Sequence, residues 1–302
     1  MNLDECGDEF WSVAMNGRES RLLPQDDCDG FDSDDDECCE TIVRTITTHA
    51  PETSKLRPLV LRLGQNRSAG CLSDVSGDVW DASLLLAIFL YGTNEGQQLC
   101  YNACFGKAAQ VDGGGILELG SGLGLAGMAA AAAVLAYTKS ASNECSSRVV
   151  LTDLNDDNIL SLLSQNVTTN LSEIGIGMDS NLSIQVQPCN WIDIANSGAN
   201  ADDSPIGTFN LIIGSELIYF PDHAIACAKT ISFYLSQSVS SQAIIIQLPE
   251  RAGFETFLSR CREMGLVISS RPVIEEVLLR VEGKLASASD YRMYFITTQK
   301  NF

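Results

Sequence analysis

The hydrophobic residues of the chain follow two patterns, short apolar runs and segments with helical spacing. Together these patterns predict a succession of strands and helices. Short runs rich in Val, Ile and Leu, bounded by polar or glycine-containing segments, are typical of strands buried in a sheet. Five such runs occur, at 115–119, 148–153, 182–187, 209–213 and 242–248. Two further β-rich runs, at 273–281 and 292–298, lie close enough in the chain to pair antiparallel.

Segments with helical apolar spacing separate these strands. They lie at about 83–90, 125–137, 157–170, 221–235 and 253–264. Repeated strand–helix units favour a parallel sheet with helices on both faces. We therefore expect an α/β fold, a Rossmann-like seven-stranded, mostly parallel sheet with one antiparallel strand. Three polar stretches, at about 92–114, 138–147 and 195–208, are interpreted as surface loops.

The chain before residue 76 has a different character. Two β-rich runs, 41–48 and 59–63, are separated by Pro51 and Pro58 and predict an antiparallel pair. Residues 1–40 are polar, acidic and of low complexity, so they cannot bury a core. We expect three parts: a disordered acidic segment at 1–40, a β-rich extension at 41–75, and an α/β domain at 76–302.

Composition narrows the class of protein. The chain has 302 residues, 45% of them hydrophobic, which suits one large domain with a buried core. Its apolar runs fall short of the roughly 20 residues that a membrane-spanning helix needs, and its start lacks the features of a signal peptide. Eleven cysteines without a CxxC pair and only two histidines predict reduced thiols and no metal site. We expect a monomer in the cytoplasm, with the nucleus left open as a further location.

Charge is concentrated at the start of the chain. Residues 1–40 hold 14 acids against two arginines, a net charge of −12 out of −20 for the whole chain. This segment would repel nucleic acid, and the sequence has no basic stripe to bind phosphates. Two interpretations remain open. The segment attracts a basic protein partner at low salt, or it is a solvated arm with no specific role.

A glycine-rich segment joins the strand at 115–119 to the helix that follows it. Its residues of interest are Glu118, Gly120, Ser121, Gly122 and Gly124. Glycines at this place let the backbone approach a ligand closely, and the helix start adds a partial positive charge. A dinucleotide fingerprint would need its third glycine at position 125, which is leucine, so a pyrophosphate ligand is disfavoured. Glu118 instead favours a ligand with a cationic amino acid end.

Two further strand ends carry candidate nucleoside contacts. Asp153 ends the strand at 148–153, where an acid accepts hydrogen bonds from two ribose hydroxyls in nucleotide-binding folds. The alternative for Asp153 is a structural role, as the cap of the helix that follows. After the strand at 182–187 comes Trp191, which would cover an adenine face, with Asn190 beside it to contact the base edge. Its alternative is a partly buried core tryptophan.

The motifs described above, together with two further segments, resemble those of a known family. Four segments carry the resemblance: 77–82 with its Val-Trp-Asp-Ala, the glycine segment 116–124, 149–154 with Asp153, and 209–219 with its acidic-x-x-Tyr. Over about residues 74–298 the chain is similar to the protein-lysine methyltransferase branch of the class I, seven-β-strand S-adenosylmethionine-dependent methyltransferases, the methyltransferase-16 family.

The resemblance implies a cofactor, S-adenosylmethionine, and roles for particular residues. Trp80 would contact the cofactor near its methionine end, and Ser215 would touch it beside Glu216. The glycine segment would line it, Asp153 would bind its ribose and Trp191 its adenine. Glu216 and Tyr219 would lie by the acceptor channel as catalytic residues. Glu216 stands where many members have Asp, and Cys189-Asn190 stands where an acid is frequent before the Trp.

A structural role is the alternative for three of these residues. Trp80 and Tyr219 would then only pack against the core, and Glu216 would be an ordinary loop carboxylate. For the whole chain we expect methylation of a lysine in a protein substrate, with no nucleic acid and no membrane involved. The alternatives are methylation of another side chain or a small molecule, and a non-catalytic cofactor-binding scaffold. An NAD-dependent oxidoreductase is excluded by Leu125 and by the predicted seven strands.

Overall fold

The protein is described by a computed structural model over residues 41–51, 56–66, 78–112, 114–138, 146–177, 180–197, 206–236, 240–280 and 288–299. The acidic segment 1–40 lies outside these residues, as does much of the two polar stretches 138–147 and 195–208. The predictions made for those segments therefore stay predictions.

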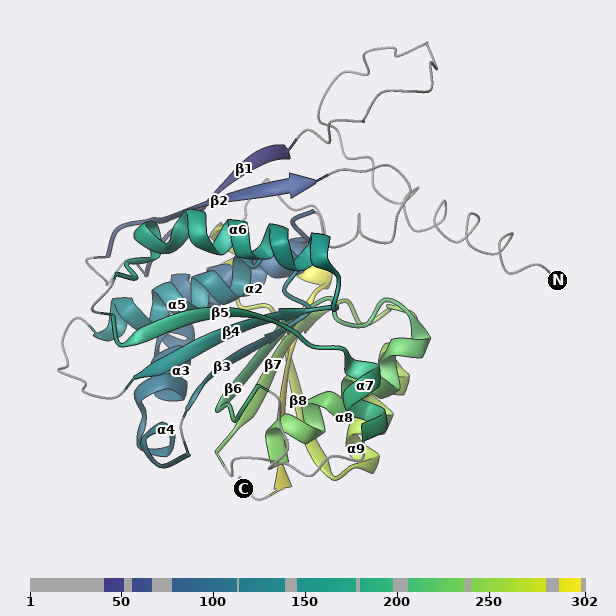
Figure 1. Cartoon of the computed structure of the whole chain (residues 1–302). Helices are drawn as coiled ribbons and strands as arrows, with labels where there is room; N and C mark the ends of the chain where they lie inside the picture. The colour runs from purple at the N-terminus through teal and green to yellow at the C-terminus, as the bar shows by residue number, and fades with distance from the viewer. Residues whose placement is uncertain are drawn as a thin grey trace, which may run out of the picture. The chain divides into compact units, whose positions relative to one another are not determined.

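A seven-stranded sheet forms the centre of the fold (Figure 1). Its strands are β3 (Gly115–Leu119), β4 (Ser147–Asp153), β5 (Leu182–Pro188), β6 (Leu211–Ser215), β7 (Gln242–Gln247), β8 (Leu266–Pro272) and β9 (Arg292–Thr298), in the order β5-β4-β3-β6-β7-β9-β8. Neighbours from β5 to β7 run parallel, and β9 runs antiparallel to both β7 and β8. The predicted fold class, including its single antiparallel strand, is confirmed.

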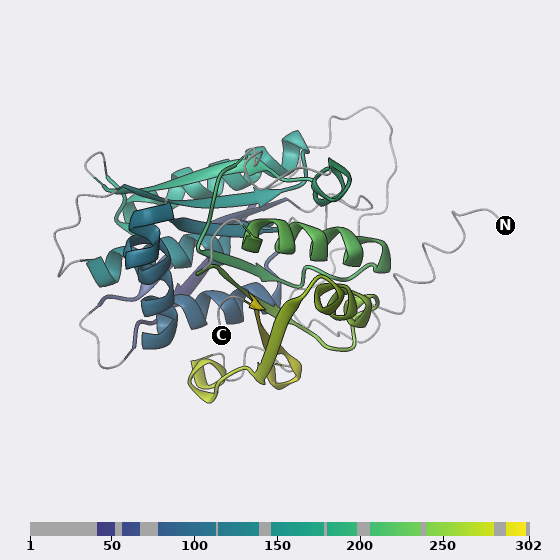
Figure 2. The same cartoon turned by 90° about the horizontal axis from the view of Figure 1, so that it is seen from below.

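Helices cover both faces of this sheet (Figures 1 and 2). They are α2 (Asp81–Gly92), α3 (Asn94–Phe105), α4 (Lys107–Asp112), α5 (Leu125–Thr138), α6 (Asp157–Ile174), α7 (Trp191–Ser197), α8 (Pro221–Ser236), α9 (Phe254–Glu263), α10 (Glu275–Arg280) and the 3₁₀ turn η3 (Ala288–Asp290). Among the described residues, none of the helices combines the length and the apolar character that crossing a membrane requires.

The alternation of side chains along each strand divides the core into two apolar clusters. Ile116 and Val149 pack with α2, α5 and α6 on one face, whereas their chain neighbours Leu117 and Val150 pack with α8 and α9 on the other. Successive side chains of a strand point to opposite faces, so a strand apolar throughout requires cover on both sides. This explains why the central strands are mostly apolar in the sequence, with Glu118 as the exception in β3.

The predicted N-terminal pair is present as β1 (Thr41–Thr48) and β2 (Leu59–Asn66), which run antiparallel. Two asparagines of α6 hold the pair against the domain. Asn166 accepts a hydrogen bond from the Gly64 amide at 2.7 Å, and Asn170 accepts one from the Arg62 amide at 2.8 Å. Their side-chain amides donate back to the carbonyls of the same residues at 3.2 and 2.8 Å. The two side chains thus imitate a neighbouring strand along β2.

The prediction of a surface loop at 92–114 is wrong, because this stretch forms α3 and α4. Thr93 caps α3, its hydroxyl accepting from the Gly96 amide at 3.0 Å. Cys100 and Cys104 lie four residues apart and are both buried against the core. Small, weakly apolar residues at helical spacing gave the inner face of this helix a polar look in the sequence.

The strand predicted at 273–281 is also wrong. The strand that pairs with β9 is β8, which ends at Pro272, and α10 follows it. Val273 and Val277 are both buried and lie four residues apart, the spacing of a helix face. The apolar residues of this stretch therefore carried a helical period that was interpreted as a strand.

Candidate functional site

Three glycines turn the chain from β3 into α5. Their φ angles are +59° at Gly120, +51° at Gly122 and +83° at Gly124, all in the left-handed region that favours glycine. A Cβ atom at Gly124 would lie 2.6 Å from a methyl carbon of Leu163 and 2.9 Å from one of Leu151. Gly124 therefore allows α5 to pack closely on the sheet and on α6, whereas residues 120–123 of the turn before it line a pocket.

Asp153 ends β4 and is tied directly to this glycine turn. The Gly122 amide donates to Asp153 Oδ2 at 2.7 Å, and the Leu154 amide donates to Oδ1 at 2.8 Å. Burial raises the pKa of Asp153 above its ordinary value, and the two amides limit that rise by favouring the charged form. The structure thus brings together the glycine turn and the carboxylate that the sequence predicted as neighbours.

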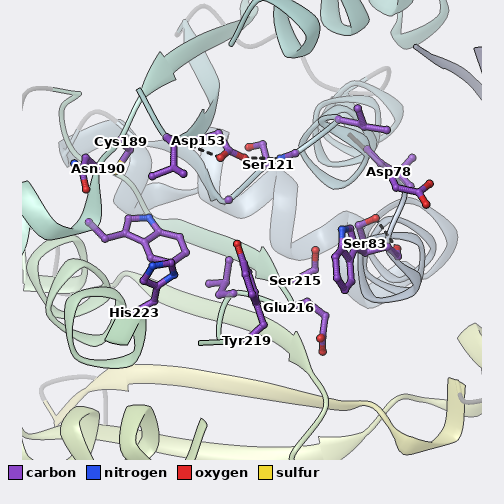
Figure 3. A pocket seen from close by; sticks show the side chains of 18 of the residues that line it. Asp78, Ser83, Ser121, Asp153, Cys189, Asn190, Ser215, Glu216, Tyr219 and His223 are labelled. Atoms are coloured by element: carbon purple, nitrogen blue, oxygen red, sulfur yellow. Dashed lines mark hydrogen bonds between the residues drawn. The ribbon is translucent and has the colours of Figure 1, made fainter. Parts of the chain in front are cut away.

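A pocket opens beside the turn at the carboxyl ends of the parallel strands (Figure 3). About 980 Å³ of space lies within it, a figure that includes solvent at its open mouth. Most of the predicted site residues line it: Trp80, Gly120, Ser121, Gly122, Asp153, Asn190, Trp191, Ser215, Glu216 and Tyr219. Two predicted residues, Glu118 and Gly124, do not.

Glu118 lies behind the glycine turn, inside the protein. Its side chain is buried, and a Cβ atom added at Gly127 of α5 would lie 2.4 Å from Glu118 Oε2. This oxygen has no hydrogen-bond partner in the part of the chain that the structure describes. Burial raises the pKa of Glu118 to about 8, so the carboxyl is largely protonated at neutral pH. Its position gives no support to the expectation that it attracts the cationic end of a ligand.

One end of the pocket is built by the start of α7. Asn190 Oδ1 accepts the amide of Ile192 at 3.0 Å and so caps this helix. The Trp191 ring lies beside the glycine turn, since a Cβ atom at Gly120 would be 3.6 Å from it. His223 of α8 meets the Trp191 ring edge-on, with 6.3 Å between ring centroids. This end therefore offers a flat apolar wall beside the carboxylate of Asp153.

Glu216 follows β6 in a conformation that is uncommon for its residue type, with φ of +48°. Its buried carboxylate is held on both oxygens. Oε1 accepts from the Leu248 amide at 2.8 Å and from Gln247 Nε2 at 3.2 Å, and Oε2 accepts from Arg251 Nε at 2.5 Å. In Figure 3 the carboxylate points away from Asp153 and Ser121. Glu216 thus joins the loop after β6 to the loop after β7.

Two aromatic rings stand beside Glu216. Trp80 precedes α2 and stacks on Tyr219, with ring centroids 6.4 Å apart and planes inclined by 20°. The Arg251 guanidinium carbon lies 5.8 Å from the centre of the Trp80 ring. Burial, followed by the charge of Asp153, raises the pKa of Tyr219, so its hydroxyl stays protonated at neutral pH. We use the name acceptor end, after the role expected for Glu216 and Tyr219, for the part of the pocket lined by Trp80, Ser215, Glu216 and Tyr219.

Sequence reasoning missed three residues of this site. Arg251 lies in a loop without a motif, and its partner Glu216 is 35 positions away. Asp78 and His223 line the pocket, and both stand near residues that were identified. The pattern Asp78-Val-Trp80 offered a signal for the first, because a short segment that places one side chain in a pocket brings its neighbours near. For Arg251 no local signal exists.

Comparison with known proteins gives a consistent result. Residues 59–263, more than half of the chain, match the family described as lysine methyltransferase. A calmodulin-lysine N-methyltransferase of Arabidopsis thaliana is 26% identical over 163 residues, which are 54% of this chain and 46% of that protein. The match therefore spans about half the length of this curated relative.

Similarity to solved structures is distant. OxaC in complex with S-adenosylhomocysteine (SAH) and oxaline is 12% identical, with a TM-score of 0.44 over 75% of this chain and 50% of that chain. The mitomycin 7-O-methyltransferase MmcR is also 12% identical, with a TM-score of 0.40 over 75% of this chain and 56% of that chain.

Proposed function

The chain belongs to the lysine methyltransferase family, and on this premise we propose that it transfers a methyl group from S-adenosylmethionine to a lysine side chain of another protein. The observation that supports this most directly is the pocket in which the glycine turn and Asp153 meet. One side of that pocket is shaped for a nucleoside, and the acceptor end is lined by aromatic rings.

The residues present fit this cofactor. A carboxylate offers about four lone-pair positions, and backbone amides use two of those of Asp153, which leaves acceptors for two ribose hydroxyls. The Trp191 ring lines the pocket beside Gly120 and offers a flat apolar surface for a base. The adenine would be held by Asn190 and Trp191. The rest of the cofactor would lie against Ser121, Gly122 and the acceptor end. When bound, S-adenosylmethionine supplies an electrophilic methyl carbon on a positively charged sulfur.

The acceptor end suits an amine. A lysine amine has a reference pKa of about 10.4 and must lose its proton to solvent before its lone pair can attack. Burial against apolar surface lowers that pKa, and the rings of Trp80 and Tyr219 provide such surface. An aromatic face also attracts an approaching cation. We assign Tyr219 as the residue that contacts the amine, and Glu216 as the carboxylate that fixes the loops around it.

The test is incubation of the purified full chain with S-adenosylmethionine labelled in its methyl group. Calmodulin, which the name of the Arabidopsis relative gives as its substrate, is one defined acceptor, and a cell extract is the other. We expect label in protein, recovered as methyl-lysine after acid hydrolysis. Asp153→Ala should abolish labelling together with SAH binding, whereas Tyr219→Leu, which removes the aromatic ring, should slow labelling at least about tenfold and retain SAH binding.

The outcomes separate the possible functions. Label that appears only in small molecules would assign a different acceptor, and label in protein at a residue other than lysine would do the same. Binding of SAH without any transfer from either acceptor would indicate a cofactor-binding scaffold and would contradict the proposal.

A further inference from the structure

Arg251 connects three segments that surround the acceptor end of the pocket. It lies in the loop between β7 and α9, and its Nε donates to Glu216, which follows β6. Its guanidinium also lies over the ring of Trp80, the residue that precedes α2. Trp80 in turn stacks on Tyr219. One side chain therefore fixes both the carboxylate and the aromatic wall of this end.

The contact with Glu216 is an ion pair between a buried carboxylate and a partly buried guanidinium. The Glu216 side chain is 3% exposed and that of Arg251 is 25% exposed. A buried carboxylate is tolerated only when a partner charge and hydrogen bonds compensate for its lost hydration. Here the amide of Leu248 and the side chain of Gln247 supply the further hydrogen bonds. The negative charge of Glu216 is consequently matched by a positive charge within hydrogen-bond distance.

We propose that Arg251 is a positioning residue that neutralises Glu216 and holds Trp80, so that the acceptor end receives the substrate amine in its uncharged form. This inference rests on the proposed function, because it concerns the lysine amine. A protonated lysine would find no unpaired carboxylate at this end, and the guanidinium would repel it. The amine therefore gains most from binding there after its proton has left to solvent. Its lone pair can then form the new nitrogen–carbon bond as the sulfur–methyl bond breaks and SAH leaves.

The other ionisable groups of the pocket do not place an unmatched negative charge at the acceptor end, where it could bind a lysine ammonium. They are Asp78, Asp153, Cys189, Tyr219 and His223. Burial raises the pKa of Cys189 to about 11 and that of Tyr219 above its ordinary value, so both are neutral at pH 7. Figure 3 shows Asp153 across the pocket from Glu216, where it accepts two backbone amides. Asp78 accepts Gln65 Nε2 at 2.6 Å and pairs with Arg44 at 3.7 Å. His223 carries no negative charge in either protonation state.

Arg251→Met keeps an unbranched apolar stem and removes the charged guanidinium. Without the guanidinium, the negative charge of Glu216 is no longer matched by a positive one. It would then favour the ammonium form of the substrate lysine, which cannot attack. We expect kcat at pH 7.5 to fall about tenfold, the KM for the acceptor not to rise, and the pH profile of kcat to move upward by about one unit, the usual effect of one nearby charge. A role in folding alone would lower the amount of active protein and leave the pH profile unchanged.

Three further variants sharpen the test. Arg251→Lys keeps the charge without the planar fork and should restore the pH profile but only part of the rate. Arg251→Met combined with Glu216→Gln removes both charges and should return the pH profile to that of the wild type. Arg262→Met changes an arginine of α9 that is 56% exposed and pairs with the exposed Glu255, so it is the matched control with wild-type behaviour.

A second readout does not depend on activity. The unfolding free energies of the wild type, Arg251→Met, Glu216→Gln and the double variant form a double-mutant cycle. We expect the double variant to be more stable than the sum of the two single effects predicts. Absence of methyl transfer by the wild type would refute the proposed function. The cycle would still measure the coupling between Arg251 and Glu216. A wild type that transfers methyl groups and an Arg251→Met variant with an unmoved pH profile would overturn the inference, as would additive stabilities in the cycle.

Discussion

Replacing Glu118 by glutamine should make the protein more stable as the pH rises, relative to the wild type. Glu118 stands in the glycine motif, yet its side chain is buried behind the turn. Burial is the main cause that raises its pKa to about 8, against an ordinary value of 4.5. Hydrogen bonds from Ser121 and the Gly127 amide oppose the rise, and the charge of Asp153 adds to it.

The sign of the effect follows from the proton count of each state. Between pH 4.5 and about 8, the unfolded chain has lost the Glu118 proton and the folded protein retains it. The unfolding free energy therefore decreases with rising pH, by about 1.4 kcal/mol for each pH unit in this window. The contribution of Glu118 is fully present below pH 4.5 and is lost as the pH passes about 8. Summed over the window, the loss is on the order of 5 kcal/mol.

Glutamine has the shape of a protonated glutamate and does not titrate, so Glu118→Gln removes this dependence. We expect similar stabilities of the two proteins near pH 5 and an advantage of several kcal/mol for the variant near pH 8. Other titrating groups are common to both proteins and cancel in the difference. Urea unfolding followed by circular dichroism at pH values from 5 to 8.5 measures it.

A matched control is Glu255→Gln, because the Glu255 side chain is 79% exposed. It should show no slope in the same comparison. Parallel stability curves of wild type and Glu118→Gln across this range would refute the reasoning, since they would mean that Glu118 is ionised in the folded state at neutral pH.

Two further predictions concern the N-terminal strand pair and the cofactor pocket. Asn170→Ala leaves the amide and carbonyl of Arg62 without their side-chain partner, so we expect a loss of about 1–3 kcal/mol in urea unfolding and faster amide exchange in β2. Unchanged exchange there would show that α6 does not hold the strand. Asp78→Asn should weaken SAH binding about five- to tenfold in calorimetric titration and leave 5′-methylthioadenosine binding unchanged, because Asp78 lines the pocket on the side opposite Asn190 and only SAH carries an α-ammonium group. Equal losses for both ligands would instead indicate a change in the shape of the pocket.

The parts of the fold that could be predicted are those whose signal is local. An apolar run such as 115–119 must be covered on both faces, and the glycines after it mark the point where the chain turns toward a ligand. The helix α3 was missed because most of its buried residues are small, and Cys100 and Cys104 are only weakly apolar and stand among charged and amide residues. Helical spacing of weakly apolar residues is a poor signal until the partner surface is known.

The site shows a deeper limit of sequence reasoning, in its carboxylates. Glu118, Asp153 and Glu216 look equivalent in the sequence, because each is an acidic residue within one position of the end of a strand. In the structure Glu118 is buried without a partner for Oε2 and holds its proton, Asp153 accepts two backbone amides beside the pocket, and Glu216 is neutralised by Arg251. What distinguishes them is the set of donors around each one, and those donors come from distant segments. A role assigned by motif position alone would give Glu118 the charge that only the other two can keep, so roles should be carried between members of the family only where the donors are also present.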